Sequence, residues 1–183
     1  MHLRLGKKKI IHDHFIFSRH PERYPQQHNH RECGLFSLKA VIESYYPETC
    51  HDACHYTNGR FHKMIGATRP RTIAKVLQKY NIHAEEGHLK EKKMETQINF
   101  LKKHVEEGPV ILVIAHSYNK ENRFNILKTL LLQHYISIRG FDDEKEVFYC
   151  YDSHTDLREN DLPVGNIAIN YYDLVSYREL AGR

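Results

Sequence analysis

Cys33 is the residue whose type and setting point most directly to chemistry. It precedes Gly34 and opens a run in which apolar residues recur at helical spacing, so we predict that it lies at the N-terminus of a helix. The free N–H groups and the dipole of a helix N-terminus stabilise negative charge, which lowers the pKa of a thiol and populates the nucleophilic thiolate near neutral pH. Cys33 is therefore the candidate nucleophile of an acyl-transfer reaction.

A thiolate that attacks a carbonyl also needs a base, a group that orients the base, and a donor for the developing oxyanion. His134 leads a strand-like stretch and is the candidate base, and Asp152, at the end of the next strand, would accept the second imidazole N–H. Gln27 precedes Cys33 by six residues and is the candidate oxyanion donor, together with the backbone N–H of Cys33. The neighbouring Gln26 competes for that role.

Each of these residues also has an ordinary structural interpretation. A cysteine before a helix is commonly a small buried residue, the chain contains 15 histidines, and an aspartate at a strand end is typical of turns. A glutamine in a polar loop is usually exposed. The chemical interpretation therefore depends on the four residue types occurring together.

Hydrophobic periodicity and helix-breaking residues predict the elements that must position these side chains. Helices are predicted over 33–46, where Pro47 ends the pattern, within 48–64, from Thr68–Pro70 to Asn81, and from Met94 to Val105 before Gly108–Pro109. Strands are predicted over 82–85, Val110–Ala115, Leu130–Arg139, Glu146–Asp152 after a turn at Phe141–Glu146, and Ile167–Ile169, followed by a short helix around Leu174. Helices thus precede an antiparallel sheet, which is an α+β layout.

Length and composition predict a single domain that spans residues 1–183. With 183 residues, of which 40% are hydrophobic and 27% are charged, the chain can bury one core but is short for two. Residues 1–24 are basic and rich in histidine, and we treat them as an N-terminal arm whose role is open, as is the oligomeric state. A net charge of +4 without a basic stripe argues against nucleic-acid binding.

The chain has no sequence signal for a membrane or for export. Its longest apolar run, Val110–Ala115, is too short to span a bilayer, and its first residues lack the apolar core of a secretory signal. Four cysteines do not make a disulfide framework in a chain of this size, and a free nucleophilic thiol is easiest to keep in a reducing compartment. We therefore expect a cytoplasmic protein without a membrane span.

A cluster of potential metal ligands lies between residues 50 and 55. Its spacing differs from the paired cysteine knuckles of structural zinc sites and from that of haem attachment. On a helix, the two cysteines would share a face, as two small buried residues do. We therefore expect neither a metal nor a cofactor. The cluster consists of Cys50, His51, Asp52, Cys54 and His55.

The order of these motifs resembles that of the double-glycine-leader peptidases, which are papain-like domains of bacterial peptide-exporting ABC transporters. Members of that family carry a glutamine six residues before a Cys-Gly pair that opens a helix, as Gln27 and Cys33-Gly34 do here. Further along they carry a helix that starts with glycine and Ser/Thr and ends in Tyr-Gly-Leu, then a Gly-Pro-Val-Ile strand, and then a His-aromatic strand that leads into a Gly-aromatic-Asp turn. The similar segments here are Gly66–Thr68 with Lys79–Ile82, Gly108–Ile111, His134–Ser137 and Gly140–Asp142.

The resemblance covers roughly residues 25–155 and implies a papain-like fold. By the same resemblance, the catalytic cysteine is Cys33, the histidine is His134, the aspartate is Asp152 and the oxyanion glutamine is Gln27. It also implies a peptide or protein substrate and leader-peptide processing. Association with a transporter or another partner stays open.

The chain departs from the family pattern at several positions. Glu32 stands where the family commonly has aspartate, Tyr151-Asp152-Ser153 stands where Asn-Asp-Pro is frequent, and 117–128 resembles an insertion close to the base in sequence. The main prediction is a cysteine peptidase that cleaves a peptide or isopeptide bond. Two alternatives stay open: a catalytically silent domain that binds a peptide, and an acyltransferase in which an amine or alcohol replaces water at the acyl-enzyme.

Overall fold

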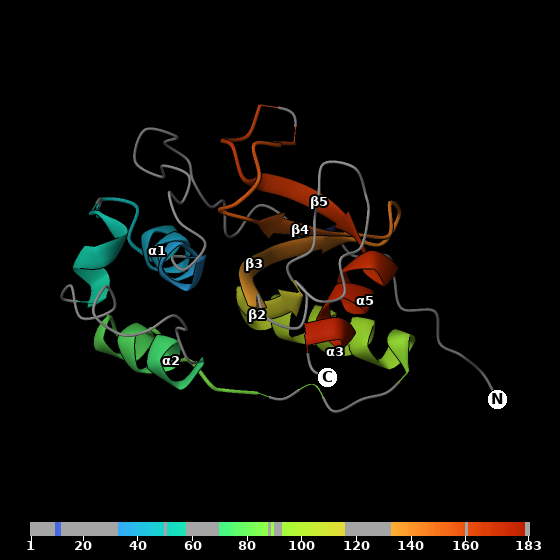
Figure 1. Ribbon diagram of the computed structural model, residues 1–183, viewed down its shortest axis with the longest axis horizontal. Helices are drawn as coiled ribbons and strands as arrows, with labels where there is room; N and C mark the ends of the chain where they lie inside the picture. The colour runs from blue at the N-terminus through green and yellow to red at the C-terminus, as the bar shows by residue number, and fades with distance from the viewer. Residues whose placement is uncertain are drawn as a thin grey trace.

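Helices and one antiparallel sheet make up the fold, which is of the α+β class (Figure 1). The computed structural model describes residues 10–11, 33–49, 51–57, 70–87, 89, 93–115, 133–159 and 161–181. The helices are α1 (Cys33–Tyr45), the 3₁₀ helix η2 (Ala53–Thr57), α2 (Pro70–Lys79), α3 (Met94–Glu107) and α5 (Tyr171–Ala181). The strands are β1 (Ile10–Ile11), β2 (Val110–Ala115), β3 (Gln133–Asp142), β4 (Val147–Tyr151) and β5 (Asn166–Asn170).

The sheet is built around β3. One edge of β3 pairs with β4, from Ser137 opposite Tyr151 to Asp142 opposite Val147. The other edge pairs with β2 along the first part of β3 and with β1 at its end. Because β4 also pairs with β5, the described sheet has the order β1-β3-β4-β5 with β2 beside β3, and all its pairings are antiparallel.

The two faces of the sheet pack against different helices. Adjacent residues on a strand point to opposite faces, and the buried side chains divide accordingly. Tyr135 and Tyr151 join a core with residues of α1 and α2, whereas Ile136 and Cys150 join a second core with residues of α3 and α5. In Figure 1, α1 and α2 lie on one side of the sheet strands and α3 and α5 on the other. The helix that starts at Cys33 thus packs directly against β3.

α1 is a core helix. Its residues from Cys33 to Glu43 are all buried, including the charged Lys39 and Glu43. The two charges are paired, because Lys39 Nζ lies 2.7 Å from Glu43 Oε1 and each side chain is only 1% exposed. Spacing of four residues places both side chains on one face of the helix, where such a pair can form. Burial of this pair removes both charges from solvent, so its geometry must be maintained.

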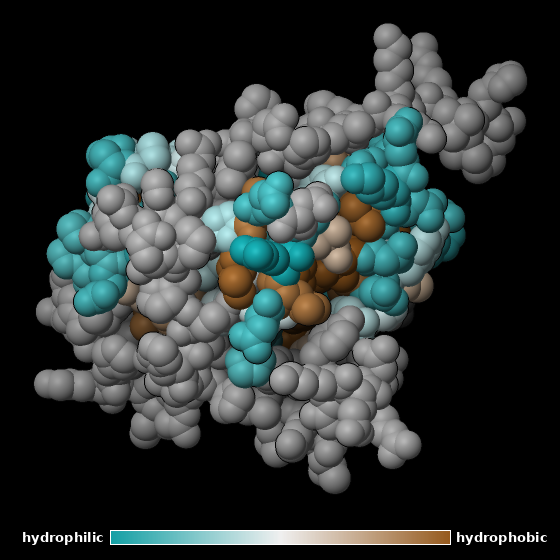
Figure 2. Space-filling model, turned by 90° about the horizontal axis from the view of Figure 1, so that it is seen from above, coloured by the Kyte–Doolittle hydropathy of each residue, from teal (hydrophilic) through white to brown (hydrophobic). Residues whose placement is uncertain are grey.

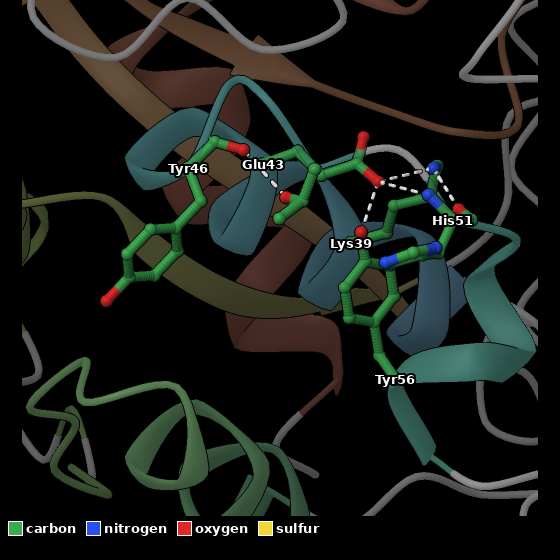
Figure 3. A network of polar contacts seen from close by, with 6 residues as sticks. Lys39, Glu43, Tyr46, His51 and Tyr56 are labelled. Atoms are coloured by element: carbon green, nitrogen blue, oxygen red, sulfur yellow. Dashed lines mark hydrogen bonds and ion pairs between the residues drawn. The ribbon is translucent and has the colours of Figure 1, made fainter.

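A polar network joins η2 to α1 (Figure 3). Lys39 also donates a hydrogen bond to the backbone carbonyl of His51, and the hydroxyl of Tyr56 donates to Glu43 Oε1. The backbone N–H of His51 lies 3.3 Å from the same carboxylate oxygen. Figure 3 shows Lys39, the N–H of His51 and the hydroxyl of Tyr56 converging on the Glu43 carboxylate, while the carbonyl of His51 meets Lys39. The charged pair in α1 therefore also holds the segment around η2 in place.

Proline, glycine and asparagine mark the helix boundaries that the sequence predicts. Pro70 is the first residue of α2, and Asn81 follows that helix in the left-handed conformation, with φ of 56°. Gly108 follows α3, and its N–H donates to the carbonyl of His104 at 3.1 Å. Proline suits the first position of a helix, where a backbone N–H would have no partner in the helix, and asparagine and glycine end helices because they tolerate a backbone that leaves the helix.

β5 forms one edge of the sheet as described. Its first residue, Asn166, is buried and donates from Nδ2 to the carbonyl of Pro163 at 3.0 Å. The residues that follow, Ile167 to Ile169, keep partial or full exposure. Figure 2 shows the molecule from above, and apolar residues gather near the middle of this view with hydrophilic residues around them. Apolar residues thus reach the surface on this side.

Three predicted elements differ from the structure. The strand predicted over 82–85 is wrong, because residues 82–87 form no regular structure and, of 82–85, only Ile82 is buried. The helix predicted within 48–64 is the 3₁₀ helix η2 in its described part. β3 runs on to Asp142, so the turn begins later than predicted, because both β1 and β4 pair with Phe141 and Asp142.

Only two residues of the predicted N-terminal arm lie in the described part of the chain. Of residues 1–24, Ile10 and Ile11 form β1, and the others lie outside the described residues. Among the helices that the structure describes, none combines the length and the apolar character needed to cross a membrane.

Candidate active site

Cys33 is the first residue of α1, and it is 6% exposed. Helix N-termini leave backbone N–H groups without partners in the helix, and these groups favour a nearby negative charge. The sulfur of Cys33 receives hydrogen bonds from the backbone N–H groups of Gly34 and of Tyr135 on β3. A helix start and a strand therefore both supply donors to the thiolate.

His134 is the second residue of β3 and pairs with Ile114 of β2 across the ladder. Its side chain is 4% exposed, and its Nε2 lies 2.7 Å from Asp152 Oδ1. Because Nε2 is engaged by Asp152, Nδ1 is the ring nitrogen available to Cys33, with which His134 also hydrogen-bonds. The structure thus brings together Cys33, His134 and Asp152 from three separate elements.

Asp152 directly follows β4 and is held by backbone groups. Its Oδ1 accepts a second hydrogen bond from the backbone N–H of His154, at 2.8 Å, and its own N–H donates to the carbonyl of Gly165, also at 2.8 Å. The register explains its position. Since Tyr151 pairs with Ser137, the antiparallel ladder brings the residue after β4 beside the start of β3.

Burial and neighbouring groups act on the pKa of Cys33 in opposite directions. Burial alone disfavours the thiolate and would raise this pKa. The hydrogen bond and the positive charge of His134, with the two backbone N–H groups, outweigh burial and hold the pKa of Cys33 below its ordinary value. The site therefore favours a thiolate at a lower pH than a free cysteine would.

The pKa of His134 is raised, which favours the positively charged imidazolium that pairs with a thiolate. Burial alone would lower it, but the charge and hydrogen bond of Asp152, and then those of Cys33, raise the pKa of His134 to about 10. For Asp152, burial is likewise outweighed by His134 and by the N–H of His154, so its pKa lies below the ordinary value. Carboxylate, imidazolium and thiolate thus support one another's charged forms.

Two serines that the sequence pattern does not mark as functional hold α1 against β3. Ser37 Oγ donates to the carbonyl of Tyr135 at 3.3 Å, and Ser137 Oγ donates to the carbonyl of Ser37 at 3.4 Å. Both side chains are buried, Ser37 one helical turn after Cys33 and Ser137 on the strand that carries His134. The only sequence signal for them is a serine inside an otherwise apolar run. A hydroxyl that is buried in such a run needs a hydrogen-bond partner.

Other residues of interest lie outside the described part of the chain. Gln27, its competitor Gln26, Cys50 and the segment 117–128 are among them, so the oxyanion donor stays a prediction. Within the described part, no three histidine, cysteine, aspartate or glutamate side chains are placed to hold a metal ion.

Comparison with known protein families gives a match over most of the chain. The family model is described as the Peptidase_C39 like family, and it matches residues 22–179. The matched range includes Cys33, His134 and Asp152, with the elements that carry them, and also Gln27. No curated protein matches the chain.

Proposed function

Because the chain belongs to the Peptidase_C39 like family, we propose that it is a cysteine peptidase in which Cys33 attacks, His134 transfers protons and Asp152 orients His134. One observation carries this assignment: the side chains make continuous contact from Cys33 through His134 to Asp152, whose Oδ1 lies 2.7 Å from His134 Nε2. The scissile bond is a peptide or isopeptide bond.

The first half-reaction transfers the acyl group to sulfur. The thiolate of Cys33 attacks the carbonyl carbon and forms a tetrahedral intermediate with a negative oxygen. The backbone N–H of Cys33, at the start of α1, and the side-chain N–H of Gln27 are the proposed donors to that oxygen. The imidazolium of His134 then gives its proton to the leaving amine as the carbon–nitrogen bond breaks, which leaves a thioester on Cys33.

The second half-reaction releases the acyl group. Neutral His134 now removes a proton from water, and the resulting hydroxide attacks the thioester carbonyl. The carbon–sulfur bond breaks, the thiolate of Cys33 leaves, and His134 retains the proton, so the initial ion pair is restored. Asp152 stabilises the imidazolium whenever it is present and fixes the ring so that Nδ1 faces the sulfur.

The finer assignments concern substrate and location. The similarity to leader-processing peptidases makes a peptide with a paired-glycine leader the first substrate class to test, with a transporter as a candidate partner. We propose the cytoplasm as the place of action, because a reducing compartment keeps a nucleophilic thiol free.

The assignment is tested by the pH dependence of Cys33 alkylation. Iodoacetamide reacts with the thiolate, so Cys33 of the parent protein should react well below pH ~8.5, where an unperturbed thiol titrates. In His134→Ala, burial is no longer offset by the imidazolium, and the reaction should require a more alkaline pH. Mass spectrometry of the Cys33 peptide separates this thiol from the other three cysteines.

His83→Ala is the matched control, because this histidine is exposed and pairs only with the equally exposed Glu85 among the described contacts. It should leave the alkylation profile of Cys33 unchanged. A parent profile that rises only near pH ~8.5 would show that the site has no activated thiolate and would reject the proposed function.

A further inference from the structure

The geometry at the start of β5 points to Gly165 as a positioning residue for Asp152, an inference that rests on the proposed function. Gly165 has φ of +93°, which L-residues rarely adopt. A Cβ at this position would lie 2.8 Å from the backbone carbonyl oxygen of Asp152 and 2.9 Å from Cε2 of Tyr151. Only a residue without a side chain allows β5 to begin this close to Asp152.

One hydrogen bond joins Gly165 to Asp152, and another joins Gly165 to Leu157. The N–H of Asp152 donates to the carbonyl of Gly165 at 2.8 Å, and the N–H of Gly165 donates to the carbonyl of Leu157 at 2.9 Å. The loop that leaves β4 at Asp152 therefore returns to the same place before β5 starts. Gly165 fixes the backbone of Asp152 through both a close contact and a hydrogen bond.

A shift of this backbone would reach the reacting thiol. Asp152 Oδ1 accepts from His134 Nε2 at 2.7 Å and from the N–H of His154 at 2.8 Å, so the carboxylate has little freedom to compensate. Hydrogen-bond strength falls steeply when distance and angle degrade. His134 would then hold its proton less firmly, and the thiolate of Cys33 would lose part of its positive partner. Gly165 thus acts on the nucleophile through Asp152 and His134.

A glycine that serves only the turn would affect stability and leave the chemistry of the folded protein intact. The two roles are separated by measuring the pH profile of Cys33 alkylation and the NMR titration of the His134 ring in folded protein. We expect Gly165→Ala to lower the alkylation rate at neutral pH by about tenfold. The His134 titration midpoint should move below its parent value of about 10.

Gly87→Ala is the matched glycine control, because a Cβ there would meet nothing within 4 Å. It should leave both readouts unchanged. A second variant, Gly165→Asn, guards against loss of folding: asparagine tolerates positive φ better than alanine does, yet its Cβ makes the same close contact. In an Asp152→Ala background, which has already lost the side-chain contact with His134, Gly165→Ala should cause no further loss, since both changes act through that contact.

Three results would overturn the inference: folded Gly165 variants with the parent profile, failure of both variants to fold, or additive losses in the Asp152→Ala background. Either of the first two results would mean that Gly165 serves the fold alone. The third would mean that Gly165 does not act through Asp152. A parent profile that His134→Ala does not change would instead reject the proposed function. A normal response to His134→Ala with unaffected Gly165 variants rejects only the positioning role.

Discussion

At the residue scale, the charge of Asp152 is the feature on which the imidazolium depends. His134 is almost fully buried, and burial by itself would strip the ring of its proton. The carboxylate reverses that effect and raises the pKa of His134 to about 10. Since the imidazolium in turn lowers the pKa of Cys33, the ionisation of the proposed nucleophile depends on Asp152 through His134.

We therefore expect Asp152→Asn to weaken the site without unfolding it. Asparagine keeps an oxygen that can accept from His134 Nε2 and from the N–H of His154, but it has no charge. The His134 titration midpoint should fall below about 10, and the alkylation rate of Cys33 at neutral pH should fall. Peptidase kcat should drop by about 10²-fold, because proton transfer by His134 is impaired.

The pH profile of Asp152→Asn shows in which direction the carboxylate shifts the pKa of His134. In the parent protein, peptidase activity should rise as pH passes the lowered pKa of Cys33 and fall as His134 loses its proton near 10. Asp152→Asn should move the alkaline fall to lower pH. Asp156→Asn, in the same loop but exposed, is the control. An unchanged alkaline limb in Asp152→Asn would contradict the assigned role of the carboxylate.

At the scale of elements, α1 depends on a charged pair that contacts no substrate in the proposed mechanism. Lys39 and Glu43 lie in its buried face, and through Tyr56 they hold η2. A buried ion pair is strongly destabilising when one partner is removed, because the other charge is left without compensation. Loss of this pair should disturb α1, whose first residue is Cys33.

We expect Glu43→Ala to lower the free energy of unfolding by about 3–5 kcal/mol, measured by urea denaturation. The double variant Lys39→Met/Glu43→Leu should recover most of that loss, since it removes both charges and keeps the volume filled. Glu85→Ala, which breaks a pair that is 85% and 82% exposed, should leave the midpoint unchanged. A Glu43→Ala protein as stable as the parent would show that the pair is not needed.

The positions of Cys33, His134 and Asp152 in these elements follow from local sequence patterns. A thiol at a helix start, a histidine at a strand start and an aspartate at a strand end are marked by periodicity and by proline and glycine. Their contact depends on the register of β3 with β4 and on the packing of α1, which no local pattern specifies. Membership of a peptidase family supports the predicted fold class and a peptidase activity.

Other features could not be predicted because tertiary packing overrides local preference. A Lys and a Glu at positions 39 and 43 usually indicate a solvent-exposed helix face, yet here they are buried together. The short apolar alternation at 82–85 resembles a strand, but no ladder forms there, and Ile82 joins the core of α1 instead. Gly165 gives no sequence signal, because its close contacts are made with residues 151 and 152.

At the scale of the whole molecule, one sheet separates two cores that share its strands. The core on the α1 side contains Ile42, and the core on the α5 side contains Leu174, and both residues are fully buried. Neighbouring residues of β3 and β4 point into different cores. The two cores should therefore lose their structure together, as one domain does.

We expect Ile42→Ala and Leu174→Ala each to lower the free energy of unfolding by about 2–5 kcal/mol and to shift one common transition. Circular dichroism reports the backbone, and the alkylation rate of Cys33 at neutral pH reports the site. The two signals should change at the same urea concentration in both variants. Two separate transitions, with one core lost before the other, would contradict the single-domain prediction.

The pairing of β3 with β4 also determines when the chain becomes chemically reactive during synthesis. α1, with Cys33, emerges from the ribosome long before the strands that supply His134 and Asp152. Until both strands are made and paired, the thiol has only its helix start to favour ionisation and no imidazolium beside it. A chain that ends before these strands therefore lacks the imidazolium that lowers the pKa of Cys33, and the proposed nucleophile is complete only when β3 and β4 are paired in register.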